Sequence, residues 1–499
     1  MKLYFEAERF LKDGGKFGGS LKSRIFSDTK LKNSPKHIFA LVCSTIKYYD
    51  FIHQIVQKSK IKQELKQKKV KVSDELLALI IHDLLFSSRG RIESGKHPIK
   101  DAILGCKTRL QAEFIKLKLR YKVTSVCQLP VNEDTNDDET PVRWFRINTI
   151  KVDQERFFKK HKFFTDLQPV NRIEELIKPG LVFSDDYIPN LYGVHPREKL
   201  SSTDAYKLGE IIIQDRASCF PAHILNEDNQ YVHKQVIDAC AAPGNKTTHA
   251  ASHLPLDDAS AVVYAIERDA KRVGVLRTMC EKATGKNKKK LIQVIHKDFT
   301  TIQPEDFSDV TGLIVDPSCS GSGIFGRAMD NALNGEKKRK KEEEEEEEEK
   351  SNEPHIDQER LRKLASFQNV IMKHALSFPG AQRVVYSTCS IHAEENERVV
   401  IDLLSDPEVR EQGWTLARRQ EVLPTWPRRG FESEFIRISR DEKVCKELAD
   451  GCVRAKPKED GGIGFFAACF VKRGKLMVDE EKSTEDISEE QNEWLGFED

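Results

Sequence analysis

The feature that most constrains the fold is an alternation of hydrophobic runs and helical patterns that begins near residue 234. Two of these runs lead directly into helical segments, in QVIDACAAPGNKTTHAASHL (235–254) and AVVYAIERDAKRVGVLRTMC (261–280). Three more runs have strand character: LIQVIHKDF (291–299), GLIVDPSCSG (312–321) and RVVYSTCS (383–390). Strands that alternate with helices pair in parallel, because a parallel partner requires a long crossover. We therefore predict an α/β fold with a doubly wound, mostly parallel sheet.

This α/β domain is expected to span residues 206–475. It opens with GEIIIQDRASCF (209–220), which has the pattern of a strand, a turn and a helix, and it ends with GGIGFFAACFVKR (461–473), which we expect to form an antiparallel strand at one side. The charge block at 336–351 and the acidic tail at 476–499 lack the apolar residues of a core. We therefore predict that both segments are disordered.

A smaller α/β module is expected at residues 141–205. The acidic, turn-rich run NEDTNDDETP (132–141) precedes it as a linker. The module begins with a strand pattern, VRWFRINTIK (142–151), and continues with a helical pattern, DQERFFKKHKFF (153–164).

The first 130 residues are strongly basic and helical in pattern. They hold 27 Lys and Arg residues against 12 Asp and Glu, a net charge of +15, whereas the rest of the chain has 54 against 68, a net charge of −14. ELLALIIHDLLF (75–86) predicts a buried helix, and Ser73 can cap the helix that begins at Asp74. The basic excess points to a polyanionic partner, but a helical domain with solvated lysines explains it equally well.

The cysteines and the hydrophobic runs indicate an intracellular protein. None of the 11 cysteines forms a CxxC pair, the N-terminus lacks the apolar run of a signal peptide, and the longest apolar stretch is too short to span a bilayer. We expect reduced thiols, no metal and no membrane segment.

Three carboxylates close successive strands: Glu267, Asp298 and Asp316. Ligands of open α/β sheets bind outside the carboxyl ends of the strands, where acidic residues can hold a ribose or an adenine amine. Each carboxylate alone could instead cap the helix that follows. The turn ACAAPGNK (239–246) precedes a helix with small residues and a glycine, which allow a ligand to approach the backbone and the helix N-terminus.

Two cysteines, Cys319 and Cys389, also follow strands of this sheet. A disulfide is disfavoured in a reducing compartment, and a metal pair lacks further ligands. Two thiols with roles in one reaction remain. Asp316 can hydrogen-bond the N3 edge of a cytosine, while a thiol attacks carbon or moves a proton. The residues do not decide which cysteine attacks. A Cys–His protease pair of Cys389 with His392 is a weaker alternative, because it needs no nucleotide-binding edge.

These motifs resemble those of the NOL/NOP/Sun-domain RNA (cytosine-5) methyltransferases. The resemblance rests on DACAAPGNKT, DPSCSGSG and YSTCSIHAEENE, with support from RINTIK, QDRASC and GFFAACF, and it covers roughly residues 1–473. LPTWPRRG (423–430) and the basic N-terminal region are similar to the subgroup of family member five, which modifies a cytosine of large-subunit (25S/28S) ribosomal RNA. The core motifs alone leave open a transfer RNA or other RNA substrate, a noncatalytic RNA-binding assembly factor or, with least support, a small-molecule methyltransferase.

The resemblance implies a class I, Rossmann-like S-adenosylmethionine-dependent methyltransferase domain, with a helical RNA-binding region at 1–130 and an RRM-like module at 141–205. It assigns the cofactor site to the loop Cys240, Ala241, Ala242, Pro243, Gly244, Asn245 and Lys246, with Glu267 at the ribose, Asp298 at the adenine and Asp316 beside the sulfonium.

It also assigns attack on C6 of the cytosine to Cys389 and release of the product to Cys319. Asp316 is expected to hold N3 and N4 of the base, and Lys246 to orient it. A monomer in the nucleus and nucleolus, acting on ribosomal RNA or a pre-ribosome, is the corresponding expectation.

Overall fold

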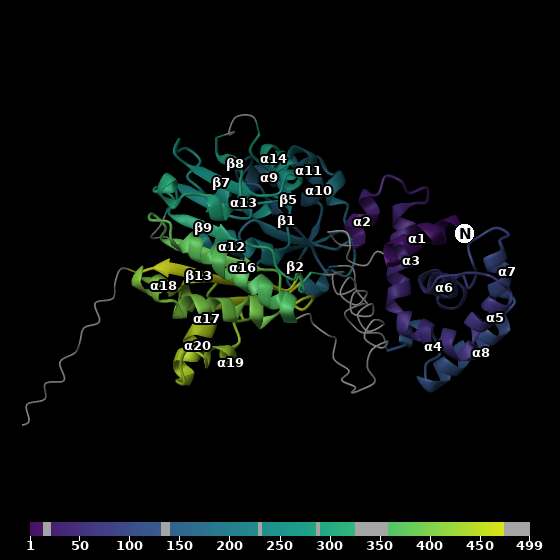
Figure 1. Cartoon of the computed structure of the whole chain (residues 1–499). Coiled ribbons are helices and arrows are strands. Elements are labelled where there is room, and N and C mark those ends of the chain that lie inside the picture. Colours follow the sequence, from purple (N-terminus) through teal and green to yellow (C-terminus); the bar gives the residue numbers. More distant parts are fainter. Residues whose placement is uncertain (13–20, 131–139, 228–231, 286–289, 325–357, 474–499) are drawn as a thin grey trace, which may run out of the picture.

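The computed structural model describes residues 1–12, 21–130, 140–227, 232–285, 290–324 and 358–473. Figure 1 shows a group of N-terminal helices at one side of a larger α/β body. The predictions for 336–351 and 476–499, and nearly all of the linker at 132–141, lie outside the described residues. No helix among the described residues is both long and apolar enough to cross a membrane.

The N-terminal region is helical and has its own hydrophobic core. Its helices are α1 (Lys2–Lys12), α2 (Leu21–Ser27), α3 (Pro35–Lys47), α4 (Tyr49–Ser59), α5 (Ile61–Gln67), α6 (Asp74–Ile81), α7 (Pro98–Leu104) and α8 (Lys107–Arg120). The predicted cap is confirmed, because the Ser73 hydroxyl accepts the N–H of Leu76 at 3.1 Å.

The buried helix predicted at 75–86 changes character after Ile81. A π-helical turn, η1 (His82–Phe86), continues α6 and carries two buried polar side chains. The Tyr4 hydroxyl donates to Asp83 at 2.7 Å, and Ser44 hydrogen-bonds His82 at 2.7 Å. These polar groups are tolerated in the core because α1 and α3 supply their partners.

A five-stranded sheet, the small sheet, follows. Its strand order is β2 (Gln168–Val170), β3 (Leu181–Ser184), β4 (Leu191–Val194), β1 (Arg143–Ile147) and β5 (Ile211–Ile213). β5 pairs antiparallel with β1, so this sheet extends past the predicted limit at residue 205. The helix expected at 153–164 is interrupted at His161, whose backbone is not helical, and forms α9 (Gln154–Lys160) and α10 (Lys162–Thr165). The short helix α11 (Asp204–Leu208) precedes β5.

The large sheet has the predicted doubly wound topology. Its order is β11 (Trp414–Leu416), β13 (Phe465–Lys472), β10 (Arg383–Thr388), β9 (Gly312–Val315), β6 (Gln235–Asp238), β7 (Val262–Glu267) and β8 (Ile292–His296). The strands from β10 to β8 are parallel, whereas β13 is antiparallel to β10, to β11 and to β12 (Cys452–Ala455). The chain winds outward in opposite directions from β6, which makes the edge beside β6 and β9 the switch point where such folds bind ligands.

Helices cover both faces of the large sheet. They are α12 (Arg216–Leu225), α13 (Asn245–His253), α14 (Ala270–Thr284), α16 (Gln358–Leu376), α17 (Glu397–Ser405), α18 (Pro407–Glu411), α19 (Glu432–Phe435) and α20 (Glu442–Asp450). One hydrophobic cluster joins α12, α13 and α14 to one face, and another joins α16 and α17 to the opposite face. The prediction of a mostly parallel α/β fold is confirmed.

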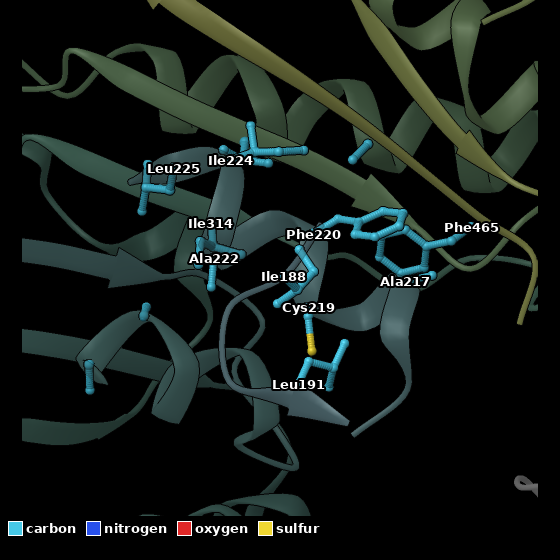
Figure 2. Close-up of a cluster of buried hydrophobic side chains, with 14 of the residues drawn as sticks. Ile188, Leu191, Ala217, Cys219, Phe220, Ala222, Ile224, Leu225, Ile314 and Phe465 are labelled. Atoms are coloured by element: carbon cyan, nitrogen blue, oxygen red, sulfur yellow. The ribbon is translucent and has the colours of Figure 1, made fainter. Parts of the chain in front are cut away.

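Helix α12 packs between the two sheets. Figure 2 shows Cys219 and Phe220 of α12 among buried side chains that include Leu191 of the small sheet and Ile314 and Phe465 of the large sheet. The small sheet and the large sheet therefore share one core, which fixes the small module against the domain that follows it.

Candidate active site

The functional side chains gather at the carboxyl edge of the parallel strands. The loops after β6, β9 and β10 meet there because these three strands lie side by side and point the same way. Parallel pairing thus brings together residues that are far apart in the sequence, such as Lys246 and Asp316.

The two cysteines singled out in the sequence are neighbours. Their sulfur atoms lie 3.0 Å apart, both residues are half-buried, and they do not form a disulfide with each other. The loop that follows β9 is tied to the end of β10, because the N–H of Gly323 donates to the carbonyl of Cys389 at 2.9 Å. Two thiols at this distance can act on the same substrate ring.

Lys246 and Asp316 form an ion pair beside the thiols, with Nζ 2.8 Å from Oδ2. The Ser387 hydroxyl donates to the other carboxylate oxygen at 2.8 Å. Burial is the largest single influence and lowers the pKa of Lys246, but Asp316, together with Cys389 and Asp238, raises the pKa of this ammonium above its usual value. The site therefore presents a fixed positive charge and an oriented carboxylate to any group that approaches the thiols.

The thiol of Cys319 is held protonated. The neighbouring Cys389 thiol, burial and the charges of Glu395 and Asp316 all raise the pKa of Cys319 well above its usual value. At neutral pH a proton is thus available on Cys319, close to Cys389.

Glu395 is a site residue that the sequence reasoning missed. Its carboxylate is fully buried and accepts hydrogen bonds from the Ser320 N–H at 2.8 Å and from the Gln368 side chain at 3.0 Å. Gln368 also donates to the carbonyl of Ser318 at 3.1 Å. These contacts hold the backbone on both sides of Cys319. The signal was present in YSTCSIHAEENE, but a glutamate on a loop is indistinguishable from a solvated one without the fold.

The other two predicted carboxylates lie on the far side of β6 from the thiols. Glu267, at the end of β7, is buried, accepts the N–H of Asp269 at 2.9 Å and lies 3.3 Å from the Arg272 guanidinium. Asp298 follows β8 and caps the turn at Thr300, whose N–H and hydroxyl it accepts at 3.1 and 2.8 Å. Asp298 therefore caps the turn that follows it, as the capping alternative predicts, and its role at the adenine stays a prediction. Asp316 instead pairs with Lys246.

The loop from Cys240 to Lys246 connects β6 to the first turn of α13. Gly244 has a φ of 114°, and a Cβ there would meet side-chain atoms of Leu276 and Met279, each at 3.1 Å. Asp238, also unassigned from the sequence, lies beneath this loop, accepts the Thr247 hydroxyl at 2.6 Å and has a pKa raised to about 6 by burial. The hydrogen bond between Asp238 and Thr247 helps to hold the loop backbone and the N-terminus of α13 at the carboxyl edge of the strands, where folds of this type bind ligands.

Among the described residues, no cluster of three or more His, Cys, Asp or Glu side chains could hold a metal ion.

Comparison with known proteins places the chain in a family. The family description "16S rRNA methyltransferase RsmB/F" matches residues 222–471, and "NOL1/NOP2/Sun domain family member 5, N-terminal domain" matches residues 36–129. The 25S rRNA (cytosine-C(5))-methyltransferase rcm1 of Schizosaccharomyces pombe is 39% identical over 94% of this chain and 91% of its own length. The 28S rRNA (cytosine-C(5))-methyltransferase of Mus musculus is 31% identical over 94% of this chain and 91% of its own length.

A solved structure shares the fold. The crystal structure of PH0851 superposes with a TM-score of 0.57 at 18% identity and covers 94% of this chain and 98% of that chain. The doubly wound sheet and the match to a methyltransferase family define a class I methyltransferase fold. The chain belongs to the NOL1/NOP2/Sun-domain family of RNA (cytosine-5) methyltransferases, and its predicted similarity to family member five is confirmed.

Proposed function

We propose that this protein transfers a methyl group to C5 of a cytosine in large-subunit ribosomal RNA. The observation that carries the proposal is the pair of thiols 3.0 Å apart beside the Lys246–Asp316 ion pair. The relatives from Schizosaccharomyces pombe and Mus musculus, which are named as 25S and 28S rRNA cytosine-C5 methyltransferases, supply the substrate class.

The residues at the edge fit S-adenosylmethionine. The buried carboxylate of Glu267 suits ribose hydroxyls: its Oε2 is paired with the Arg272 guanidinium at 3.3 Å but accepts no hydrogen bond from the described residues. Small residues from Cys240 to Gly244 leave room for the methionine part, and Asp298 can accept the adenine amine. When bound, the cofactor supplies an electrophilic methyl on its sulfonium.

Cys389 is assigned as the nucleophile. C5 of cytosine is a poor nucleophile until a thiolate adds to C6, because the new S–C6 bond places electron density on C5. After C5 is methylated, its proton must leave so that the S–C6 bond breaks and aromaticity returns. We assign Cys319, whose sulfur is 3.0 Å from that of Cys389, as the base for release: it first passes its own proton to solvent, and the resulting thiolate then takes the C5 proton.

Asp316 and Lys246 are assigned to the base itself. A carboxylate fixed by Lys246 and Ser387 can accept the exocyclic N4 amine of cytosine and contact its N3 edge. A uracil presents a carbonyl at that position, so the same carboxylate disfavours it. The target base must leave its stack to reach this buried edge.

The remaining assignments follow the same proposal. The basic region at 1–130 would bind RNA phosphates, the small α/β module, whose sheet includes β5, would lie beside the catalytic domain that follows it, and the protein would act as a monomer in the nucleus and nucleolus. Exposed cations of the N-terminal helices support the RNA contact, among them Lys107 and Arg120 on α8.

Replacement of Cys389 by Ala tests the function. We expect bisulfite sequencing of large-subunit ribosomal RNA, in cells where this protein is the sole active copy, to show one methylated cytosine with the wild type and none with Cys389→Ala. Cys280→Ala, at a buried cysteine on α14, is the matched control and should keep the methyl group. Full methylation with Cys389→Ala would refute the mechanism. A methylated transfer RNA in place of ribosomal RNA would refute the substrate.

A further inference from the structure

The segment LPTWPRRG (423–430) is held along strand β12. Arg429 forms an antiparallel bridge with Val453, and the N–H of Gly430 donates to the carbonyls of Ala449 at 3.0 Å and Cys452 at 3.2 Å. Trp426 is 1% exposed, and its indole N–H donates to the carbonyl of Arg454 at 2.7 Å. The proposed chemistry gives this segment no role, yet it fixes the position of the residue that follows it, Phe431.

Phe431 is an exposed aromatic ring on a rigid support. Its ring is 46% exposed and lies over the guanidinium of Arg454, whose central carbon is 3.8 Å from the ring centroid. Its N–H donates to Oε1 of Glu397 at 3.0 Å. An exposed phenylalanine usually gains rotamer freedom in water, but here the backbone and one ring face are both held.

Arg454 connects Phe431 to the active edge. It is 8% exposed and forms a two-pronged pair with the fully buried Glu397, at 2.6 and 2.5 Å. Its remaining nitrogen donates to the carbonyl of Ile391 at 3.1 Å, two residues past Cys389. Its guanidinium also lies 5.6 Å from the ring of Phe466, which pairs in register with Thr388. One buried guanidinium thus ties Phe431 to both sides of the nucleophile.

The chemistry of the reaction supplies the partner for this ring. When a cytosine leaves its stack, the base next to it loses a stacking neighbour, and proteins commonly replace such a neighbour with an aromatic side chain. Building on the proposed RNA methyltransferase function, we propose that Phe431 stacks against an unpaired base that adjoins the target cytosine. Phe431 is then a substrate-binding residue that helps to select the RNA, and LPTWPRRG is the segment that fixes its position.

RNA binding without cofactor, and methylation kinetics with S-adenosylmethionine, test the proposal. The probes are unmodified large-subunit ribosomal RNA made by transcription and a fluorescein-labelled, unstructured RNA oligonucleotide. We expect Phe431→Ala to raise the dissociation constant for the oligonucleotide, and the KM for the ribosomal RNA, by about 5- to 150-fold, the range for loss of one base–aromatic stack. Phe431→Trp should restore both values to within about threefold of wild type, since indole stacks at least as well.

Two control variants separate stacking from other roles. Phe163→Ala removes a ring that is 41% exposed on α10 of the small module, and it should leave both values unchanged. Phe431→Leu keeps an apolar contact without a flat ring and should behave like Phe431→Ala. If Phe431→Ala matches wild type, or if Phe431→Leu restores binding as well as Phe431→Trp does, the proposal is wrong.

The two hypotheses fail in different ways. If the wild type transfers no methyl group to any RNA, the proposed function fails, whatever Phe431 does. If the wild type methylates RNA and Phe431→Ala matches it in RNA affinity and KM, only the stacking role fails. A purely structural role would instead lower the melting temperature of Phe431→Ala, and tryptophan would not rescue its RNA affinity.

Discussion

The two thiols of the site have different surroundings, and this difference supports different roles. The hydrogen bond with Cys389, burial, and the charges of Glu395 and Asp316 raise the pKa of Cys319 and favour its protonated form. Cys389 directly follows β10, and its sulfur lies 3.0 Å from that of Cys319. In the proposed reaction, Cys389 bonded to C6 of the cytosine carries neither a proton nor a charge. The strongest influence that keeps Cys319 protonated then disappears, which favours Cys319 as a base at the release step.

Loss of Cys319 should therefore trap the reaction after methyl transfer. We expect Cys319→Ala, incubated with unmodified ribosomal RNA and methyl donor, to accumulate a covalent RNA–protein species on a denaturing gel, because attack by Cys389 needs no Cys319 but breakdown does. The double variant Cys319→Ala/Cys389→Ala is the control and should give no such species. Rapid turnover by Cys319→Ala without an adduct would rule out its role as the base.

At the scale of elements, the strands of the large sheet could be predicted from the sequence, whereas the pairing of β5 could not. Hydrophobic runs alternating with helices sufficed for the parallel sheet, and strand-end positions sufficed to bring Cys319 near Cys389. The same patterns could not show that β5 pairs in the small sheet and not in the large one, because a three-residue apolar strand fits either sheet. They also could not identify Glu395 or Asp238 as residues of the site, because whether a carboxylate is buried depends on helices from other parts of the chain.

The junction between the small module and the α/β domain depends on one glycine. Gly209 ends α11 with a φ of +72°, and a Cβ there would lie 2.3 Å from the backbone carbonyl oxygen of Lys282 on α14. The side-chain amide of Asn148 donates to the carbonyls of Gly209 and Ala283, each at 2.8 Å. The left-handed backbone of Gly209 and the close approach of α14 therefore coincide at this point.

Gly209→Ala should destabilise the protein more than its backbone conformation alone requires. We expect a loss of about 2–5 kcal/mol in free energy of unfolding, from a left-handed alanine plus overpacking against α14. Gly90→Ala, at a φ of +56° with nothing within 4 Å, is the control and should cost only about 1 kcal/mol. Denaturant unfolding measures both. Equal losses would show that the α11–α14 contact yields without cost.

Three histidines between α12 and α13, of which His249 is buried and the other two are half-buried, contribute to the pH dependence of the stability of the whole molecule. His223 lies on α12, and His249 and His253 lie on α13, with the rings of His249 and His253 5.0 Å apart. Burial lowers the pKa of His223 and of His253 to about 4, and it lowers that of His249 well below its usual value. The charge of Arg146 further disfavours protonation of His249 and His253. Folding therefore depends on keeping these three rings neutral.

The sign of the resulting pH dependence follows from linkage. An unfolded histidine takes up a proton near pH 6.5, whereas folded His253 does so only near pH 4, so its stabilisation is complete above pH 6.5 and is lost as the pH falls toward 4. Asp215 and Asp238, whose pKa values burial raises to about 6, act in the opposite direction over part of this range. A comparison of wild type with a single variant isolates the histidine, because the aspartates are common to both.

His253→Phe keeps a ring of similar shape and removes the titration. We expect the fall in free energy of unfolding between pH 7 and pH 4.5 to be about 2 kcal/mol smaller in this variant than in wild type, because one histidine no longer draws the unfolded state down by proton uptake. Denaturant titrations at the two pH values measure the difference. An identical fall in His253→Phe and wild type would mean that His253 is protonated in the folded protein, and that the α12–α13 layer tolerates charge.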